Sequence, residues 1–161
     1  MITPEQLAEW FDQNLRIIKM QTQGLAHADC LLQPPVRGNC MNWVLGHIAR
    51  YRNDVLLALG EEPALDPAAA ERYQNGSAPV TGEGEGVLPL QTLLAALEQA
   101  QAGIAVGLKR ATPESLARKV QDGGQTFPLA QYLFGLYFHE TYHVGQPELL
   151  RQLAGTDDQV I

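Results

Sequence analysis

The chain has 161 residues, of which 45% are hydrophobic and 18% charged, and its formal net charge at pH 7 is −7. This length suits one domain, residues 1–161, that buries most of its apolar surface. The negative charge and the lack of a basic stripe exclude nucleic acid as a partner, because such binding depends on Lys and Arg that neutralise phosphates.

The distribution of apolar residues argues against a membrane protein. No apolar run approaches the roughly 20 residues of a membrane span, and the start MITPEQLAEW lacks the basic and apolar regions of a signal peptide. We therefore expect a cytoplasmic protein with no membrane partner. The two cysteines, Cys30 and Cys40, do not form a CxxC motif, so reduced thiols are expected.

The first helix is predicted by its start signal. Thr3, Pro4 and Gln6 supply an N-cap, a first-turn proline and a capping-box glutamine, and Gly24 is the expected stop. The segment that follows, up to residue 39, contains two adjacent prolines and a glycine and is expected to be mainly loop.

The second helix is expected from about Asn42, acting as its cap, to Leu59, with Gly60 just beyond its end. Trp43, His47, Tyr51 and Val55 then lie along one face. His47 is thus placed on a largely apolar stripe, which should face the interior of the protein.

A long crossover with one helical turn near Ala68 is expected over residues 61–88, because this segment is rich in Pro, Gly and Ser. The third helix should run from Pro89 to about Arg110. A short turn is predicted at Thr112–Glu114, and Val120–Gly124 is taken for a glycine-containing link.

The last helix is predicted from Thr126, as its N-cap, to Gly155, as its C-terminal stop. Apolar residues surround it almost completely, which is typical of a central helix. Four such helices without β-α-β alternation predict an all-α four-helix bundle, whose facing helices can build a metal site in the core.

The last helix carries two histidines one turn apart, His139 and His143, so both imidazoles project from one face and can share a metal ion. With Glu140 they match the HExxH motif, in which the glutamate is the general base of a metalloprotease. A protease is the weaker interpretation, because Glu148 is too near on the same helix to close the site and no strand-rich substrate platform precedes the motif. We expect Glu140 to pair at the bundle surface or beside the metal ligands.

A third ligand has to come from another helix, and His47 is the candidate. Three histidines leave coordination positions open, as a catalytic metal site requires. The alternative is that His47 is a core histidine bonded to a carbonyl group and that the other two are merely neighbours. Both interpretations stay open on residue types and spacing alone, whereas His27 lies in a polar loop and is expected at the surface.

Other side chains near these histidines have two interpretations each. Asp54 lies seven residues beyond His47 and could orient an imidazole, although a solvated charge is the simpler interpretation. Tyr51, Tyr132 and Tyr142 line a cavity in one interpretation and fill the core in the other.

Two segments, NWVLGHIARYRNDVL and HETYHVGQPELLRQLAG, resemble the DinB/YfiT-like superfamily of small bacterial four-helix bundle proteins, and nearly the whole chain fits that layout. The resemblance implies an up-up-down-down bundle, frequently a homodimer. It also implies a divalent metal held by His47, His139 and His143. Pro147 departs from the usual pattern and is expected either to kink the helix or to be absorbed by neighbouring helices.

The relatives that this resemblance brings in include metal-dependent transferases and isomerases that use low-molecular-weight thiols such as bacillithiol or mycothiol. The function expected from it is a metal-dependent enzyme, a thiol-dependent transferase or an isomerase or hydrolase, with a small-molecule substrate. The alternative is a non-catalytic metal-binding or stress-response protein. Neutral imidazoles suit zinc or nickel, and also iron, manganese or copper.

Overall fold

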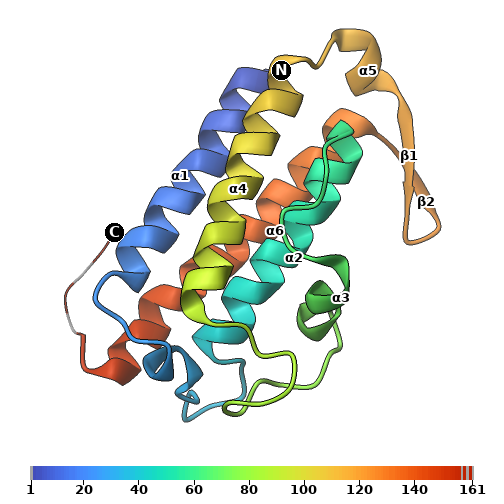
Figure 1. Ribbon diagram of the computed structural model, residues 1–161. Coiled ribbons are helices and arrows are strands. Elements are labelled where there is room, and N and C mark those ends of the chain that lie inside the picture. Colours follow the sequence, from blue (N-terminus) through green and yellow to red (C-terminus); the bar gives the residue numbers. More distant parts are fainter. Residues whose placement is uncertain (1, 157, 159, 161) are drawn as a thin grey trace.

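Four long helices pack side by side as a bundle in the computed structural model, which describes residues 2–156, 158 and 160 (Figure 1). They are α1 (Pro4–Thr22), α2 (Met41–Leu59), α4 (Leu90–Lys109) and α6 (Leu129–Leu150). The shorter elements are η1 (Ala28–Leu31), α3 (Pro67–Ala70), η2 (Glu71–Tyr73), α5 (Pro113–Ala117), β1 (Lys119–Asp122), β2 (Gln125–Pro128) and η3 (Arg151–Ala154). The expected all-α four-helix class is confirmed.

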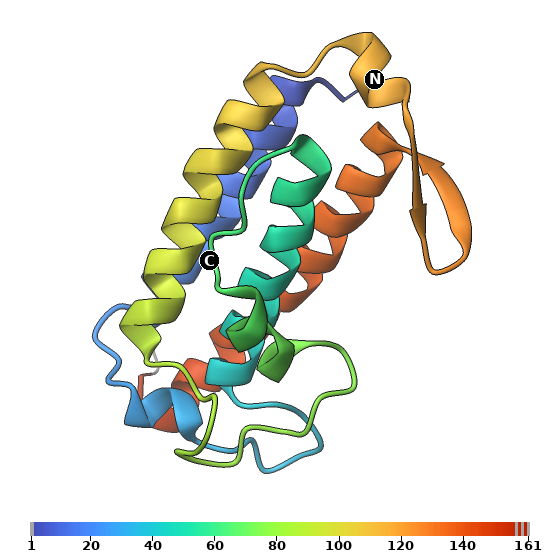
Figure 2. The same cartoon turned by 45° about the vertical axis from the view of Figure 1, so that its right-hand side comes forward.

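As the colours along the chain show, α1 runs down in the views of Figures 1 and 2, α2 and α4 run up, and α6 runs down again. Residues 60–89 lead the chain back along the bundle, so α2 and α4 run parallel. Gly103 and Gly107 of α4 consequently lie against Leu56 and Leu59 of α2, in the same order along both helices. The expected up-up-down-down order is therefore wrong, because an up-up start needs a second long crossover, between the first two helices.

The helix starts follow the predicted signals at α1 but not at α2. Thr3 and Gln6 form the predicted capping box. At α2, Cys40 rather than Asn42 occupies the N-cap position. Asn42 is instead buried in the first turn, where its amide donates to the Leu88 carbonyl at 2.8 Å and accepts from the Tyr73 hydroxyl at 3.1 Å. The Asn42 side chain thus bonds the crossover to α2. A capping rule considers only residues near each other in sequence and does not predict such a contact.

A two-stranded antiparallel hairpin takes the place of the link and helix start expected between residues 120 and 128. Gly123 and Gly124 form its two-residue turn with φ of 53° and 78°, the left-handed conformations that glycine adopts without steric cost. Thr126 pairs with Gln121 in the hairpin, so the N-cap of α6 is Pro128, two residues later than predicted, and the helix begins at Leu129. Gly155 ends the helical segment as predicted, with φ of 82° directly after η3, but the α-helix itself already ends at Leu150.

The helix α6 is one of four equivalent bundle helices rather than a central one. Phe138, Tyr142 and Leu149 are each about two-thirds exposed, at 66%, 66% and 68%. The prediction of a central helix is wrong because these large apolar side chains form an outward face instead of packing in the core. Pro147 is buried, and α6 continues through it to Leu150. Three residues before the proline, the Val144 carbonyl accepts a hydrogen bond from the side chain of Gln21 of α1 at 3.0 Å.

A buried ion pair ties all four long helices together. The Arg52 guanidinium, fully buried, donates to both carboxylate oxygens of Glu140 at 2.9 and 2.8 Å. Its other three bonds reach the Phe11 carbonyl, the Leu97 carbonyl and the Gln101 side chain. All five N–H donors of the guanidinium are thereby satisfied, which is the condition for a buried charge to be tolerated.

Both cysteines are buried and free, as predicted. Burial raises the pKa of the Cys30 thiol to about 12, so this thiol stays protonated. None of the helices in the described part of the chain combines the length and hydrophobicity that a membrane crossing requires.

Candidate metal centre

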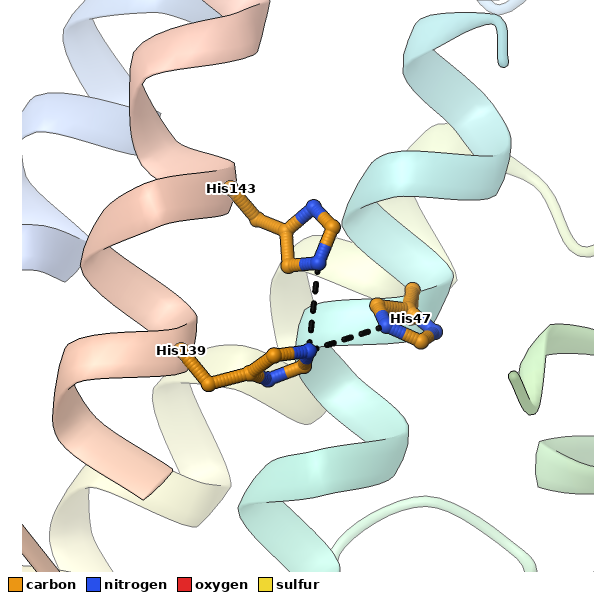
Figure 3. A group of neighbouring side chains, drawn as sticks. All are labelled: His47, His139 and His143. Carbon is orange, nitrogen blue, oxygen red and sulfur yellow. Dashed lines mark hydrogen bonds between the residues drawn. The ribbon is translucent and has the colours of Figure 1, made fainter. Parts of the chain in front are cut away.

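Three imidazoles converge between α2 and α6, and they are the three that the sequence singled out (Figure 3). His139 and His143 lie one turn apart on α6, and their Nε2 atoms are 3.2 Å apart. His47, from the middle of α2, places its Nε2 3.4 Å from that of His139. The antiparallel packing of α2 against α6 brings together residues about ninety positions apart in the sequence.

The outer nitrogens of two imidazoles fix which inner nitrogens carry lone pairs. His47 Nδ1 lies 2.7 Å from the Tyr73 carbonyl, and His143 Nδ1 lies 2.9 Å from Gln146 Oε1. Since both partners are acceptors, each Nδ1 carries the hydrogen and each Nε2 is a bare acceptor. The two lone pairs point toward His139 Nε2 (Figure 3).

Without an ion, the three imidazoles have two protonation patterns. A hydrogen on His139 Nε2 can be donated to the two facing lone pairs, whereas Nδ1 of the same ring is buried without a hydrogen-bond partner in either tautomer. The other tautomer faces three lone pairs toward one another. A cation at the centre removes this repulsion. A tetrahedral ion with metal–nitrogen distances of about 2.05 Å separates its ligand atoms by about 3.3 Å, close to both measured separations.

The electrostatics of the site keep the imidazoles neutral. The pKa of His47 is lowered to about 4, mainly by burial and also by the neighbouring His143, His139 and Arg50, against the opposing effect of the hydrogen bond to the Tyr73 carbonyl. Burial also lowers the pKa of both His139 and His143. Metal ligands must be deprotonated, so these shifts favour metal binding at neutral pH.

The carbonyl that accepts the hydrogen bond of His47 belongs to Tyr73, a residue that the sequence analysis did not identify. The Tyr73 ring packs against Gly46, where an added Cβ would lie only 2.2 Å from the ring. The Tyr73 hydroxyl accepts a hydrogen bond from the Leu88 amide at 2.7 Å and donates to Asn42. A glycine in the middle of a helix, directly before the histidine, was the available signal for this close approach.

The imidazoles line a cavity of about 770 Å³, which is in the size range of sites for small organic molecules. Its walls are largely aromatic. Trp43 stacks on His47 with ring centroids 4.4 Å apart, and Tyr51 lies 4.4 Å from the His139 ring. Of the two interpretations of Tyr51, Tyr132 and Tyr142, the cavity lining is the observed one.

The other sequence-predicted residues are not part of this centre. Glu140 was expected at the surface or beside the metal ligands, but it is buried on the far side of α6 from the cavity and binds Arg52 and Asn14. The reason is that the neighbouring helices supply it with a buried cation. Asp54 pairs with Arg50, one turn away on α2. His27, expected at the surface, is half-buried and accepts from the Leu90 amide at the start of α4.

Comparisons with known proteins agree with this geometry. The family model described as the DinB superfamily matches residues 11–146. A solved structure, a conserved protein of Enterococcus faecalis, matches with a TM-score of 0.74 and 18% sequence identity, over 97% of this chain and 99% of that one. At this identity the likeness establishes the fold alone. The search of curated proteins found no match.

Proposed function

The chain belongs to the DinB superfamily, and from this membership and its converging imidazoles we propose that it is a metal-dependent enzyme acting on a small organic molecule. In this proposal His47, His139 and His143 hold one divalent transition-metal ion. Zinc and nickel suit three neutral imidazoles, as do iron and copper, whereas manganese favours oxygen ligands.

The observation that carries the proposal is the set of bare Nε2 lone pairs on the wall of a large cavity. A structural metal site is closed by four protein ligands, whereas three protein ligands leave a position for water or substrate. The open position would face the cavity, because Trp43, Tyr51 and the three histidines all line it. A catalytic role is therefore favoured over a purely structural one.

The chemistry proposed is thiol-dependent transfer, isomerisation or hydrolysis. A bound divalent ion would supply Lewis acidity, which stabilises a thiolate or lowers the pKa of a bound water. The chain itself contributes aromatic walls on which the apolar part of a substrate can pack. It also contributes the Tyr132 phenol, whose pKa is raised to about 12 by burial and by Asp54 and Asp122, so that it stays a hydrogen-bond donor at neutral pH.

A metalloprotease is not supported, although the chain contains the HExxH motif. Both carboxylate oxygens of Glu140 are engaged by Arg52, and Glu140 is only 3% exposed. It is not among the residues that line the cavity, where the general base of the motif would have to reach a metal-bound water.

Cobalt substitution tests the proposal. Co²⁺ is added to metal-free protein, and the visible spectrum is followed while a low-molecular-weight thiol such as 2-mercaptoethanol is titrated. We expect a tetrahedral cobalt spectrum and a new thiolate-to-cobalt charge-transfer band that saturates with thiol. A cobalt spectrum that thiols leave unchanged would favour the non-catalytic metal-binding alternative. No bound cobalt would contradict the metal centre itself.

A further inference from the structure

The charges around the cavity differ from those of a site for anionic molecules. Among the described residues that line it, none is Lys or Arg, and apart from the histidines Asp122 is its one formally charged side chain. Sites for phosphates and carboxylates use Arg or Lys to bind them. From this charge pattern we infer that the cavity takes an amine-bearing organic substrate, with the ammonium group held by Asp122 and the apolar part against the aromatic walls.

Arg50 is not one of the residues that line the cavity. It forms an ion pair with Asp54 on the same helix, and its guanidinium carbon lies 4.6 Å from the centroid of the Tyr51 ring. Asp54 compensates this charge in part, since Arg50 still contributes to the lowered pKa of His47 and His139. Among the described residues that line the cavity, no side-chain cation lies with Asp122, so an anionic substrate group there would meet the carboxylate alone and an ammonium group would pair with it.

The wall is suited to a cation as well as to an apolar group. Trp43, Tyr51, Phe127, Tyr132 and Tyr142 all line the cavity. Aromatic faces attract ammonium groups through the negative potential of their π systems, and they also bury apolar surface. A wall of this kind beside one carboxylate is the chemistry that recognises an organic amine.

The β1–β2 hairpin supplies two of the side chains that would contact an amine in the cavity. Asp122 is the last residue of β1, and Phe127 lies on β2, paired with Val120. The hairpin projects beside the start of α6 (Figures 1 and 2). The carboxylate also lies near Tyr132, since Asp122 contributes to the raised pKa of that phenol. The hairpin thus contributes one exposed acidic side chain and one partly buried aromatic side chain to the cavity wall, and the histidines belong to other elements.

Three probes of similar shape and different charge test the inference, which rests on the proposed function only in taking the cavity for the substrate site. They are 2-phenylethylamine, 2-phenylethanol and 3-phenylpropionate. Each is titrated into the metal-loaded protein and into the protein after chelation, and binding is followed by the indole resonance of Trp43. Trp10, which packs against Tyr137 outside the cavity lining, is the internal control.

We expect the amine to bind at least fivefold more tightly than the alcohol in both forms of the protein, and Asp122→Asn to remove that preference. Asp12→Asn is the matched control, because it removes the same charge from an exposed ion pair on α1. In the chelated protein 3-phenylpropionate should bind more weakly than the alcohol. An amine that binds no better than the alcohol, or a preference that survives Asp122→Asn, overturns the inference.

The two proposals fail in different ways. Loss of the amine preference in protein that still binds metal contradicts only the substrate class. A preserved amine preference in protein that binds no divalent ion contradicts only the metal centre, because the chelated form is measured separately.

Discussion

Replacing Glu140 with Gln should destabilise the bundle strongly while leaving the cavity intact. The substitution removes the negative charge that compensates Arg52, and it places an amide N–H₂ group where the guanidinium needs an acceptor. Arg52 is 0% exposed and Glu140 is 3% exposed, so water cannot replace the lost partner. Removing one partner of a buried ion pair costs about 3–5 kcal/mol.

This cost is a large part of the 5–15 kcal/mol by which a domain is ordinarily stable. For a chain of this length, 1 kcal/mol shifts the melting temperature by about 2–4 °C, so Glu140→Gln should lower it by about 6–20 °C. The double variant Arg52→Met/Glu140→Leu should recover much of the loss, because apolar replacement of a whole buried pair is often neutral or stabilising.

The assay is thermal and urea denaturation followed by circular dichroism. Glu98→Gln is the matched control. Glu98 also pairs with a cation, Lys19, but both side chains are about half exposed, and such pairs contribute about 0–1 kcal/mol. If Glu140→Gln melts within a degree or two of the parent, or no lower than Glu98→Gln, the assignment of this pair as a core element is refuted. Well below its melting temperature, Glu140→Gln should keep most of the activity on the true substrate, whereas a metalloprotease with Glu140 as its general base would lose nearly all of its activity.

Three further predictions concern the site and the assembly. Metal loading should persist below pH 6 and disappear toward pH 4, because the folded-state pKa of His47 is about 4. The stability of the fold should follow the same direction. It is highest above the unfolded pKa of about 6.5, where the imidazoles are neutral in both states, and it falls as the pH drops from there toward the folded pKa. Loading that already fails at pH 6.5 in a chelator-competition titration would contradict these shifts. Gln146→Leu should weaken metal binding about 10–100-fold by releasing the His143 ring, whereas Gln131→Leu, elsewhere on the cavity wall, should not. The homodimer implied by the family resemblance should use the exposed face of α6, so light scattering should give twice the chain mass for the parent and less for Phe138→Ser; a parent that stays monomeric at micromolar concentration would exclude it.

The helices and the histidine set followed from local signals in the sequence. The capping box at Thr3 and the left-handed Gly60 after α2 depend on neighbouring residues only, and both are confirmed. The placement of His47 beside His139 and His143 followed from its position on an apolar stripe, since that stripe must face the core. That these residues bind metal stays a prediction.

The remaining features depend on contacts between distant segments, which spacing does not encode. Glu140 appeared to belong to a catalytic motif because the motif is local, whereas its partner Arg52 is 88 positions away. Tyr73 lies in the crossover and is tied to the site through its backbone carbonyl, which no residue type signals. The short hairpin was missed because four-residue strands carry too few alternating positions to stand out beside two glycines.

The most direct test of the metal centre is calorimetric titration of Zn²⁺ into untagged, metal-free protein, with His47→Ala and His27→Ala measured beside the parent. His27 is the matched control, because it is the fourth histidine of the chain and lies outside the cluster. We expect one ion per chain in the parent, unchanged binding in His27→Ala, and binding at least a hundredfold weaker in His47→Ala, because two imidazoles one turn apart on α6 leave the coordination shell open on the α2 side. His47→Ala that binds zinc as tightly as the parent would contradict the three-histidine centre.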